Sequence, residues 1–249
     1  MMNTELNINL QDTQWQFEYV DHDRNIARAI VYDESGQFYF VRAERDDDFG
    51  KAITIETAGG GVEDGEDLIT AIRRELKEEL GVQVEVVCKI GVVSDYYNLI
   101  HRHNINNYFL CKIESFGEKN LTQDEIERFH LSTLKLSYEE AVREYEDRAN
   151  TSLGKLIANR ELPILHRAKE IIERRISNSP LQVCRALSGG QGGCLCPLYF
   201  MKLYICIAYD ALYCFTGKNH LKGCPFFIAL TYRDASIMKP HYLTHQCKP

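Results

Sequence analysis

Three glutamates, Glu75, Glu78 and Glu79, lie close together in GGGVEDGEDLITAIRRELKEELGV, the stretch from residue 59 to residue 82. On an α-helix with 3.6 residues per turn they fall within about 100° of arc, at one edge of an apolar stripe. Like charges four residues apart destabilise an isolated helix by about 0.2–0.5 kcal/mol. Carboxylate oxygens at this spacing suit Mg²⁺ or Mn²⁺. The spacing leaves two interpretations open, a solvated charged face and a cation site.

The residues around the glutamates indicate how this helix is positioned. Residues 59–61 are glycines that end a predicted strand at 52–57, and Leu68, Ile72 and Leu76 share one side of the helix. A helix with such a stripe packs against a sheet. We therefore expect the glutamates at the border between core and solvent.

The rest of the first 180 residues is rich in strands and poor in helices. Alternating and β-branched patterns predict strands at 15–20, 25–33, 37–45, 82–97 with a break at Gly91, 104–116 and 131–136. A solvated acidic loop is expected at 46–48. Helices are expected at 122–130, at 137–149 behind a Ser137–Glu140 capping box, and at 153–176. This order predicts a mixed α/β sandwich rather than a doubly wound sheet.

Composition limits the partners. The chain has 249 residues, 45% of them hydrophobic, and a formal charge of −7. This is enough for one well-buried core, and the charge disfavours nucleic acid or an anionic membrane as partner. The polar N-terminus lacks the apolar region of a signal peptide, so we expect a cytoplasmic protein.

The composition changes sharply near Pro180. Residues 1–180 carry 22 Lys and Arg against 34 Asp and Glu, a net charge of −12. Residues 181–249 carry 7 against 2, contain no Glu and hold seven of the nine cysteines. We therefore predict a catalytic domain at 1–180 and a Cys-rich tail at 181–249 outside it.

Three interpretations of the tail differ in what they require. A zinc site would use Cys194 and Cys196, but no pair has the C-x₂-C spacing. A membrane span at 195–215 would bury Lys202 and Asp210, each costing roughly 2.5–3.5 kcal/mol near a bilayer centre. The missing Glu and the irregular pattern favour an accidental frame, a fusion or a poorly ordered tail.

The opening stretch resembles the signature of the Nudix hydrolases, G-x5-E-x7-R-E-U-x-E-E-x-G-U, where U is a bulky aliphatic residue. The match starts at Gly60, includes Glu66 and the run from Arg74 to Glu79, and ends at 81–82 without a mismatch. The resemblance covers about residues 10–175. It implies a Nudix-type α/β/α sandwich with a mixed β-sheet and hydrolysis of a nucleoside diphosphate linked to another moiety.

The resemblance also implies roles for individual residues. Glu75, Glu78 and Glu79 would hold Mg²⁺ or Mn²⁺ with the carbonyl of Gly59, and Arg74 would orient the glutamates together with Glu66. Arg74 and the three glutamates are the predicted catalytic residues. The general base stays open between a box glutamate such as Glu78 and a later acid: Glu114, Glu118, Asp124 or Glu125.

Substrate choice is expected outside the signature. The segment 41–45 is similar to that of ADP-ribose and nucleotide-sugar members, so Arg42 or Arg45 is expected to meet a phosphate. Those members often carry a proline after the signature, and this chain has SDYYNLIHRHN there. Tyr97, like Tyr96, could stack on a base. Arg102, with His101 and His103, could hold phosphate. Tyrosines and basic residues at a strand end are more often ordinary surface, which is the alternative for each.

The expected partner is a small-molecule nucleotide, and the dimerisation common in the family implies a possible homodimer. Two other functions compete with hydrolysis. An isopentenyl diphosphate isomerase would need a catalytic cysteine that nothing here suggests. A non-catalytic nucleotide sensor is the main alternative, although sensors often lose signature carboxylates and this chain keeps all of them.

Overall fold

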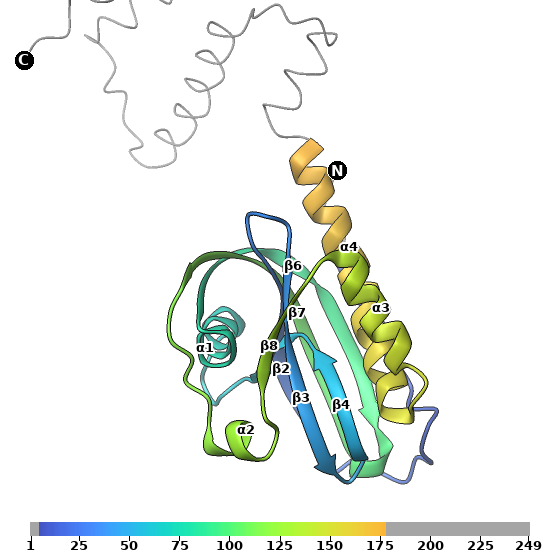
Figure 1. The fold of residues 1–249 in the computed structure, drawn as a ribbon. Helices are drawn as coiled ribbons and strands as arrows, with labels where there is room; N and C mark the ends of the chain where they lie inside the picture. Colours follow the sequence, from blue (N-terminus) through green and yellow to red (C-terminus); the bar gives the residue numbers. More distant parts are fainter. Residues whose placement is uncertain (1–4, 178–249) are drawn as a thin grey trace, which may run out of the picture. The chain divides into compact units, whose positions relative to one another are not determined.

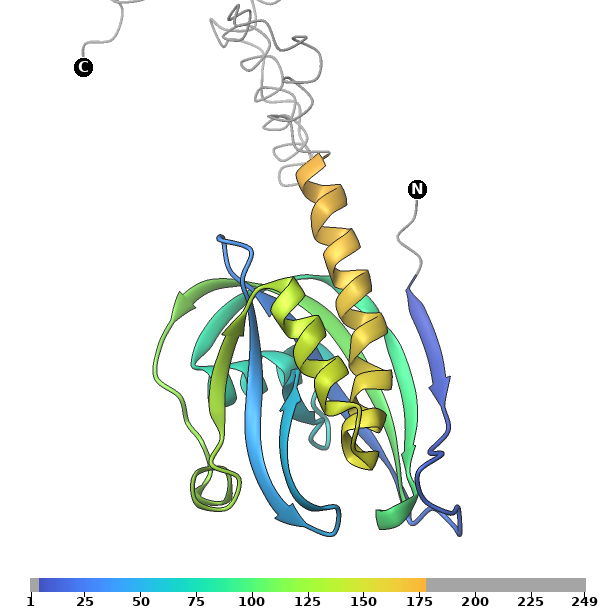
Figure 2. The same ribbon diagram turned by 45° about the vertical axis from the view of Figure 1, so that its right-hand side comes forward.

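The computed structural model describes residues 5–177, which form a β-sheet with helices on both faces (Figures 1 and 2). The sheet is mixed and has eight strands: β1 (Leu6–Leu10), β2 (His22–Tyr32), β3 (Phe38–Asp47), β4 (Gly50–Glu56), β5 (Ala58–Gly61), β6 (Val82–Tyr97), β7 (Arg102–Phe116) and β8 (Ser132–Leu136). Their order is β1-β6-β7-β2-β3-β4, with β5 paired to β2 and β8 to β3. β1 is parallel to β6 and β2 to β7, and the other pairs are antiparallel.

Helices cover the two faces of the sheet. α1 (Leu68–Leu80) lies on one face, and α3 (Tyr138–Arg148) and α4 (Ser152–Ser177) lie together on the other (Figures 1 and 2). The short α2 (Gln123–Glu127) and the 3₁₀-helix η1 (Asn98–Ile100) lie in connections. The predicted α/β/α sandwich with a mixed sheet is confirmed.

Side chains alternate between the two faces of the sheet along each strand, and this divides the core into two clusters. Ala29 and Val31 of β2 pack with Ile72 and Leu76 of α1, whereas Ile30 packs on the opposite side, with α3 and α4. Successive side chains of a strand point to opposite faces, so both faces of β2 are buried. The sheet is therefore anchored on both sides, which fixes the strand ends that build the site.

Several predicted elements differ from the structure, among them the acidic loop expected at 46–48, of which residues 46 and 47 belong to β3. Residues 15–20 form no strand, because the Asp12 carboxylate accepts hydrogen bonds from the N–H groups of Gln14, Trp15 and Asn98 and turns the chain after β1. The glycines at 59–61 form β5 instead of ending a strand. β6 continues through Gly91, with register shifts instead of a break. A Cβ at Gly91 would lie 2.3 Å from the carbonyl oxygen of Leu6, so this glycine lets β1 approach.

The sheet opens between β2 and β3. The two strands pair only at Val31 and Tyr32. Ahead of that point β2 pairs with β5, while β3 continues along β4 from Val41 onward. The two ladders diverge, and both contribute side chains to one cavity.

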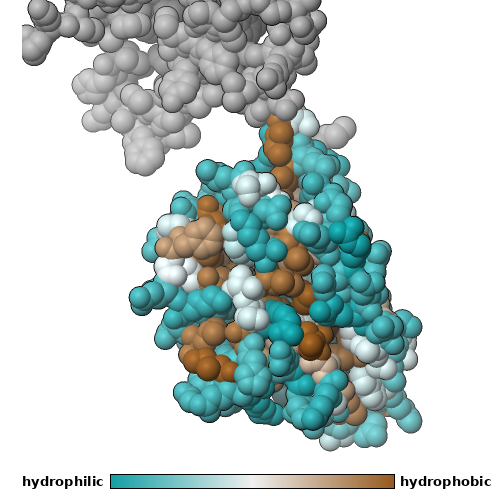
Figure 3. Space-filling model, viewed as in Figure 1, coloured by the Kyte–Doolittle hydropathy of each residue, from teal (hydrophilic) through white to brown (hydrophobic). Residues whose placement is uncertain are grey.

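The exposed surface is mixed. The face in Figure 3 is mostly hydrophilic, with hydrophobic residues between the polar ones. The large hydrophobic side chains that are exposed are scattered along the described chain: Phe17, Tyr19, Ile53, Phe116, Ile126 and Ile176. Single exposed apolar residues are normal on a folded domain.

Within residues 5–177, no helix has the length and apolar character to cross a membrane. The zinc and membrane interpretations of the tail, and the boundary at residue 180, fall outside the described residues.

Gly154, in the first turn of α4, tests how α3 and α4 are joined. A Cβ there would lie 2.0 Å from the carbonyl oxygen of Arg148, so Gly154→Ala must push the helices apart. We expect a loss of about 1–3 kcal/mol, a fall in Tm of roughly 2–4 °C per kcal/mol, measured by thermal unfolding. Gly117→Ala, whose Cβ would meet its nearest atom at 3.8 Å, is the control. Equal Tm values would contradict the packing.

Candidate active site

α1 is defined at both ends by its own sequence. The Asp67 carboxylate accepts hydrogen bonds from the N–H groups of Ile69 and Thr70, which caps the first turn. Gly81 ends the helix with φ of 66°, a left-handed conformation that glycine adopts without strain. With Leu76 buried against the sheet, the glutamates are held at the edge of the helix.

Arg74 binds the acidic residues around it. Its guanidinium donates to Glu66 at 2.9 and 3.0 Å, to Glu75 at 2.7 Å and to Glu78 at 3.3 Å. It also donates to the carbonyl of Gly61 at 3.0 Å. One cation thereby separates two predicted metal-binding carboxylates and ties the helix to β5.

Glu79 turns away from Arg74 toward β5. Its carboxylate accepts a hydrogen bond from the N–H of Gly59 at 2.8 Å. Gly59 has φ of 142°, and a Cβ there would lie 2.1 Å from the carbonyl oxygen of Ala27, so only glycine fits. The backbone of β5 can therefore lie directly beside the carboxylate.

The carboxylates of α1 are poorly compensated. Burial raises the pKa of Glu79 to about 8, with a further contribution from Glu75 and against the effect of the Gly59 hydrogen bond. Burial also raises the pKa of Glu75, although Arg74 opposes it. Ionising these carboxyl groups costs free energy because they are buried near one another, and a bound cation would offset that cost.

A fourth acid lies near Glu75 and Glu79. Glu125 of α2 interacts electrostatically with Glu75 and Glu79. Its carboxylate is fixed by the N–H and hydroxyl of Thr122, at 2.6 and 2.8 Å, in a capping box. The other later acids proposed as bases, Glu114, Glu118 and Asp124, are exposed and do not line the cavity.

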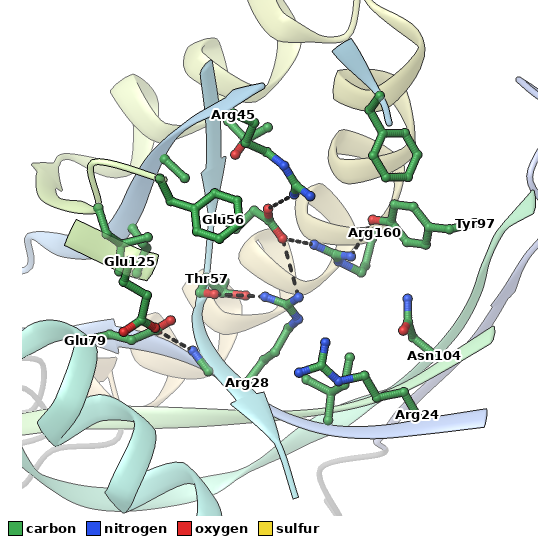
Figure 4. A pocket seen from close by; sticks show the side chains of 18 of the residues that line it. Arg24, Arg28, Arg45, Glu56, Thr57, Glu79, Tyr97, Asn104, Glu125 and Arg160 are labelled. Atoms are coloured by element: carbon green, nitrogen blue, oxygen red, sulfur yellow. Dashed lines mark hydrogen bonds and ion pairs between the residues drawn. The ribbon is translucent and has the colours of Figure 1, made fainter. Parts of the chain in front are cut away.

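The cavity between the diverging ladders has a volume of about 340 Å³. Figure 4 shows Glu79 and Glu125 at one side of it, Arg28 in the middle, and Arg24 and Asn104 beyond Arg28. Its lining is rich in arginine and aromatic residues: Arg24, Arg28, Arg45, Arg102 and Arg160, with Phe49, Tyr97 and Phe129. Acids and arginines thus share one opening.

Glu56 of β4 links three of these arginines. Its carboxylate lies 3.4 Å from Arg28, 3.6 Å from Arg45 and 2.9 Å from Arg160. Burial would raise the pKa of Glu56, but the three guanidinium groups outweigh it and lower the pKa to about 2. Glu56 is therefore an anion that holds the middle of the cavity together.

Arg160 is a buried charge, 1% exposed, that reaches the cavity from α4. It donates to Glu161 at 2.9 Å, to Glu56 at 2.9 Å and to the hydroxyl of Tyr97 at 2.7 Å. Glu161 in turn accepts from Thr57 and Tyr108. Since a buried ion is costly unless paired, this network fixes α4 against the sheet.

The substrate-binding residues expected from the sequence are divided by the structure. Arg45, Tyr97 and Arg102 line the cavity. Arg42 does not, because neighbouring residues of β3 point to opposite faces, and it pairs with Glu44 at 2.9 Å. Arg42 therefore lies outside the cavity that Arg45 lines.

The histidines of the same segment also lie elsewhere. His103 contacts Asp23 and Ser94, each at 2.7 Å, and stacks on Tyr96. His101 stacks on Tyr19. Neither these two histidines nor Tyr96 lines the cavity. Tyr97 and Arg102 are directly paired across β6 and β7, which puts both on the cavity side.

Sequence reasoning missed Arg24, Arg28, Glu56 and Arg160. A signal was present for Arg28, since a charge inside the apolar strand NIARAIVY has to find partners. Arg160 and Glu161 lie side by side in a helix predicted only as amphipathic. Their burial depends on partners in β4 and β6, which no local pattern reveals.

The donors fit a hard cation. Within residues 5–177, no three His, Cys, Asp or Glu side chains are gathered closely enough to form a ready metal cluster. Yet Glu75, Glu78 and Glu79 offer oxygen only, and Arg74 is the cation that now contacts two of them. An oxygen-only set of donors is the kind that hard divalent cations prefer.

The sequence profile of the NUDIX domain matches residues 22–156, more than half of the chain. The chain therefore belongs to the Nudix family and is a Nudix pyrophosphohydrolase. Members of this family act on small-molecule nucleotide substrates and generally use divalent metals.

Solved structures give similarities at low identity. A NUDIX hydrolase from Nitrosomonas europaea is 19% identical over 49% of this chain and 78% of its own, with a TM-score of 0.42. The E. coli ORF135 protein is 19% identical over 61% and 93%, with a TM-score of 0.43. A MutT NUDIX hydrolase from Burkholderia pseudomallei is 18% identical over 48% and 86%, with a TM-score of 0.39. A comparison with curated protein sequences gives no match.

The raised pKa of Glu79 makes the stability of the metal-free protein depend on pH. Between about pH 4.3, the pKa of an unfolded glutamate, and about 8, the folded state binds more protons, so stability falls as pH rises. Glu79→Gln removes this loss. We expect the variant to exceed wild type by on the order of 5 kcal/mol at pH 9, and by little at pH 4.

Chemical denaturation in chelator at both pH values measures this difference. Glu85→Gln, at an exposed position of β6, is the control and should follow wild type at both. A difference between Glu79→Gln and wild type that does not change with pH would contradict the buried carboxyl.

Proposed function

We propose that the chain hydrolyses the pyrophosphate bond of a nucleoside diphosphate linked to another moiety, with Mg²⁺ or Mn²⁺, and that ADP-ribose or a nucleotide sugar is the substrate class. One observation carries this proposal. A single cavity joins carboxylates at Glu79 and Glu125 to a wall of arginines and aromatic rings. Pyrophosphate needs both, since metal ions and guanidinium groups neutralise its charge.

The metal would be held by Glu75, Glu78 and Glu79 with the carbonyl of Gly59. Bound there, it would polarise the P–O bond and lower the pKa of bound water. Arg74 would keep the glutamates apart and oriented until they bind it. In this role Arg74 acts on the carboxylates and not on the substrate.

Other residues of the chain would bind, orient and move a proton. Glu125, fixed by Thr122 and facing Glu79, is the later acid best placed to accept a proton from the attacking water. Arg45 would meet a phosphate. Tyr97 and Phe49, whose rings lie 5.8 Å apart, would offer apolar faces to a base or sugar.

A panel of nucleoside diphosphate derivatives with Mg²⁺ or Mn²⁺ tests the reaction, with phosphate monoester products read by chromatography. We expect turnover of at least one ADP-ribose-like or sugar-linked compound. Tight binding of one compound without turnover of any would support the sensor instead.

The carboxylates are tested on that substrate. We expect Glu79→Gln and Glu125→Gln each to lower kcat by at least about 100-fold, because one removes a metal ligand and the other a base. Glu85→Gln should match wild type. Wild-type rates in Glu79→Gln would overturn the metal assignment.

We also propose that residues 1–180 are the catalytic unit. α4, which supplies Arg160, ends at Ser177. Truncation after Asn178 should therefore leave metal-dependent hydrolysis within about twofold of the full chain. Loss of activity in the truncated protein would show that the tail belongs to the enzyme. Cytoplasmic location and a homodimer stay predictions, the latter checked by sedimentation.

A further inference from the structure

Two arginines of the cavity differ from the other three. Arg28, Arg45 and Arg160 each pair with a carboxylate. No ion pair or hydrogen bond to an acid within residues 5–177 involves the guanidinium of Arg24 or Arg102. Arg102 lies over the ring of Tyr97, 5.8 Å from its centroid, and its Nε is buried without a hydrogen-bond partner.

The two guanidinium groups repel one another. Burial lowers the pKa of Arg102, and the charges of Arg24, Arg28 and Arg45 lower it further. Burial and Arg28 likewise lower the pKa of Arg24. Glu75 opposes this effect at Arg24, but neither guanidinium forms an ion pair with an acid of residues 5–177, so like charges lie together at one end of the cavity, an arrangement that an anion would relieve.

The polar group between these arginines is also unpaired. Asn104, 1% exposed, lines the cavity, and its Oδ1 has no hydrogen-bond partner. Arg24 and Asn104 are directly paired across β2 and β7, which places Asn104 beside Arg24. Two residues earlier on the same strands, His22 is paired with Arg102. Figure 4 shows Arg24 and Asn104 on the other side of Arg28 from Glu79.

We propose that Arg24 and Arg102, with Asn104 between them, form an anion subsite that takes a phosphoryl group of the substrate at the end of the cavity away from Glu79. This inference rests on the proposed function. The phosphoryl group has two possible sources, the second phosphate of the pyrophosphate or an additional phosphate ester on the moiety linked to it. Both are recognised by the same chemistry, paired guanidinium groups.

Binding of inorganic phosphate to the metal-free full chain tests the subsite without hydrolysis. Titration calorimetry should show Arg24→Gln and Arg102→Gln binding phosphate about 10- to 100-fold more weakly than wild type. Arg143→Gln, at an exposed position of α3 outside the cavity, should bind like wild type. Unchanged phosphate affinity in both cavity variants would overturn the subsite.

Stability separates binding from a structural role. Because Arg102 is charged, half-buried and unpaired, Arg102→Gln should have the same Tm as wild type or a higher one without phosphate. Saturating phosphate should then raise the Tm of wild type above that of the variant. A lower Tm of the phosphate-free variant, with unchanged phosphate affinity, would show that Arg102 is structural.

Two substrates distinguish the sources, ADP-ribose and the same compound bearing a phosphate ester. An equal rise in KM for both with Arg102→Gln would assign the pyrophosphate, and a larger rise for the ester would assign the additional phosphate. Unchanged KM for both would overturn the assignment to the substrate. If no compound is hydrolysed yet phosphate binding depends on both arginines, the proposed function fails and the anion subsite stands.

Discussion

The buried guanidinium of Arg160 is the interaction on which the rest of the cavity depends. A charge that is 1% exposed must be matched by acids and acceptors, and these come from α4 itself, β4 and β6. The ion pairs of Arg160 with β4 and β6 fix the position of α4 against the sheet. They also hold Glu56 in the cavity, where the same carboxylate pairs with Arg28 and Arg45.

The charges of the site follow from this network and from the divergence of β2 and β3. The divergence exposes polar side chains of β2, β3 and β7 that a continuous ladder would have covered. Glu56 neutralises the centre of the opening, so unmatched charge is left at its two ends. Within the described part of the chain, carboxyl groups without a cationic partner lie at one end, at Glu79 and Glu125, and arginines without a carboxylate partner lie at the other, at Arg24 and Arg102. A substrate with anionic groups, brought together with divalent cations, complements both ends.

Arg74 shows how such a site is compatible with a folded metal-free protein. Carboxylates one turn apart repel, and Arg74 contacts Glu75 and Glu78 while Glu79 is held by the N–H of Gly59. The acids are thus stabilised by groups that lie beside the predicted metal position. Arg74 also donates to the carbonyl of Gly61 and to Glu66, and Glu79 accepts from Gly59, so these residues join α1 to β5 and to the loop before the helix as well as supplying ligands.

The sequence by itself determined α1, the capping box of α3 and the α/β/α class, because these depend on residues within one or two turns or on local periodicity. It also named the box residues by their spacing. It missed the turn at Asp12 and placed a strand at 15–20, since the partner of that turn, Asn98, is distant in the chain. Only the tertiary structure decided that Arg45, Tyr97 and Arg102 share a cavity while Arg42 does not, and that Arg28 and Arg160 meet at Glu56. Strand register and the divergence of the ladders set those contacts, and they arise from pairing between segments that no local pattern connects.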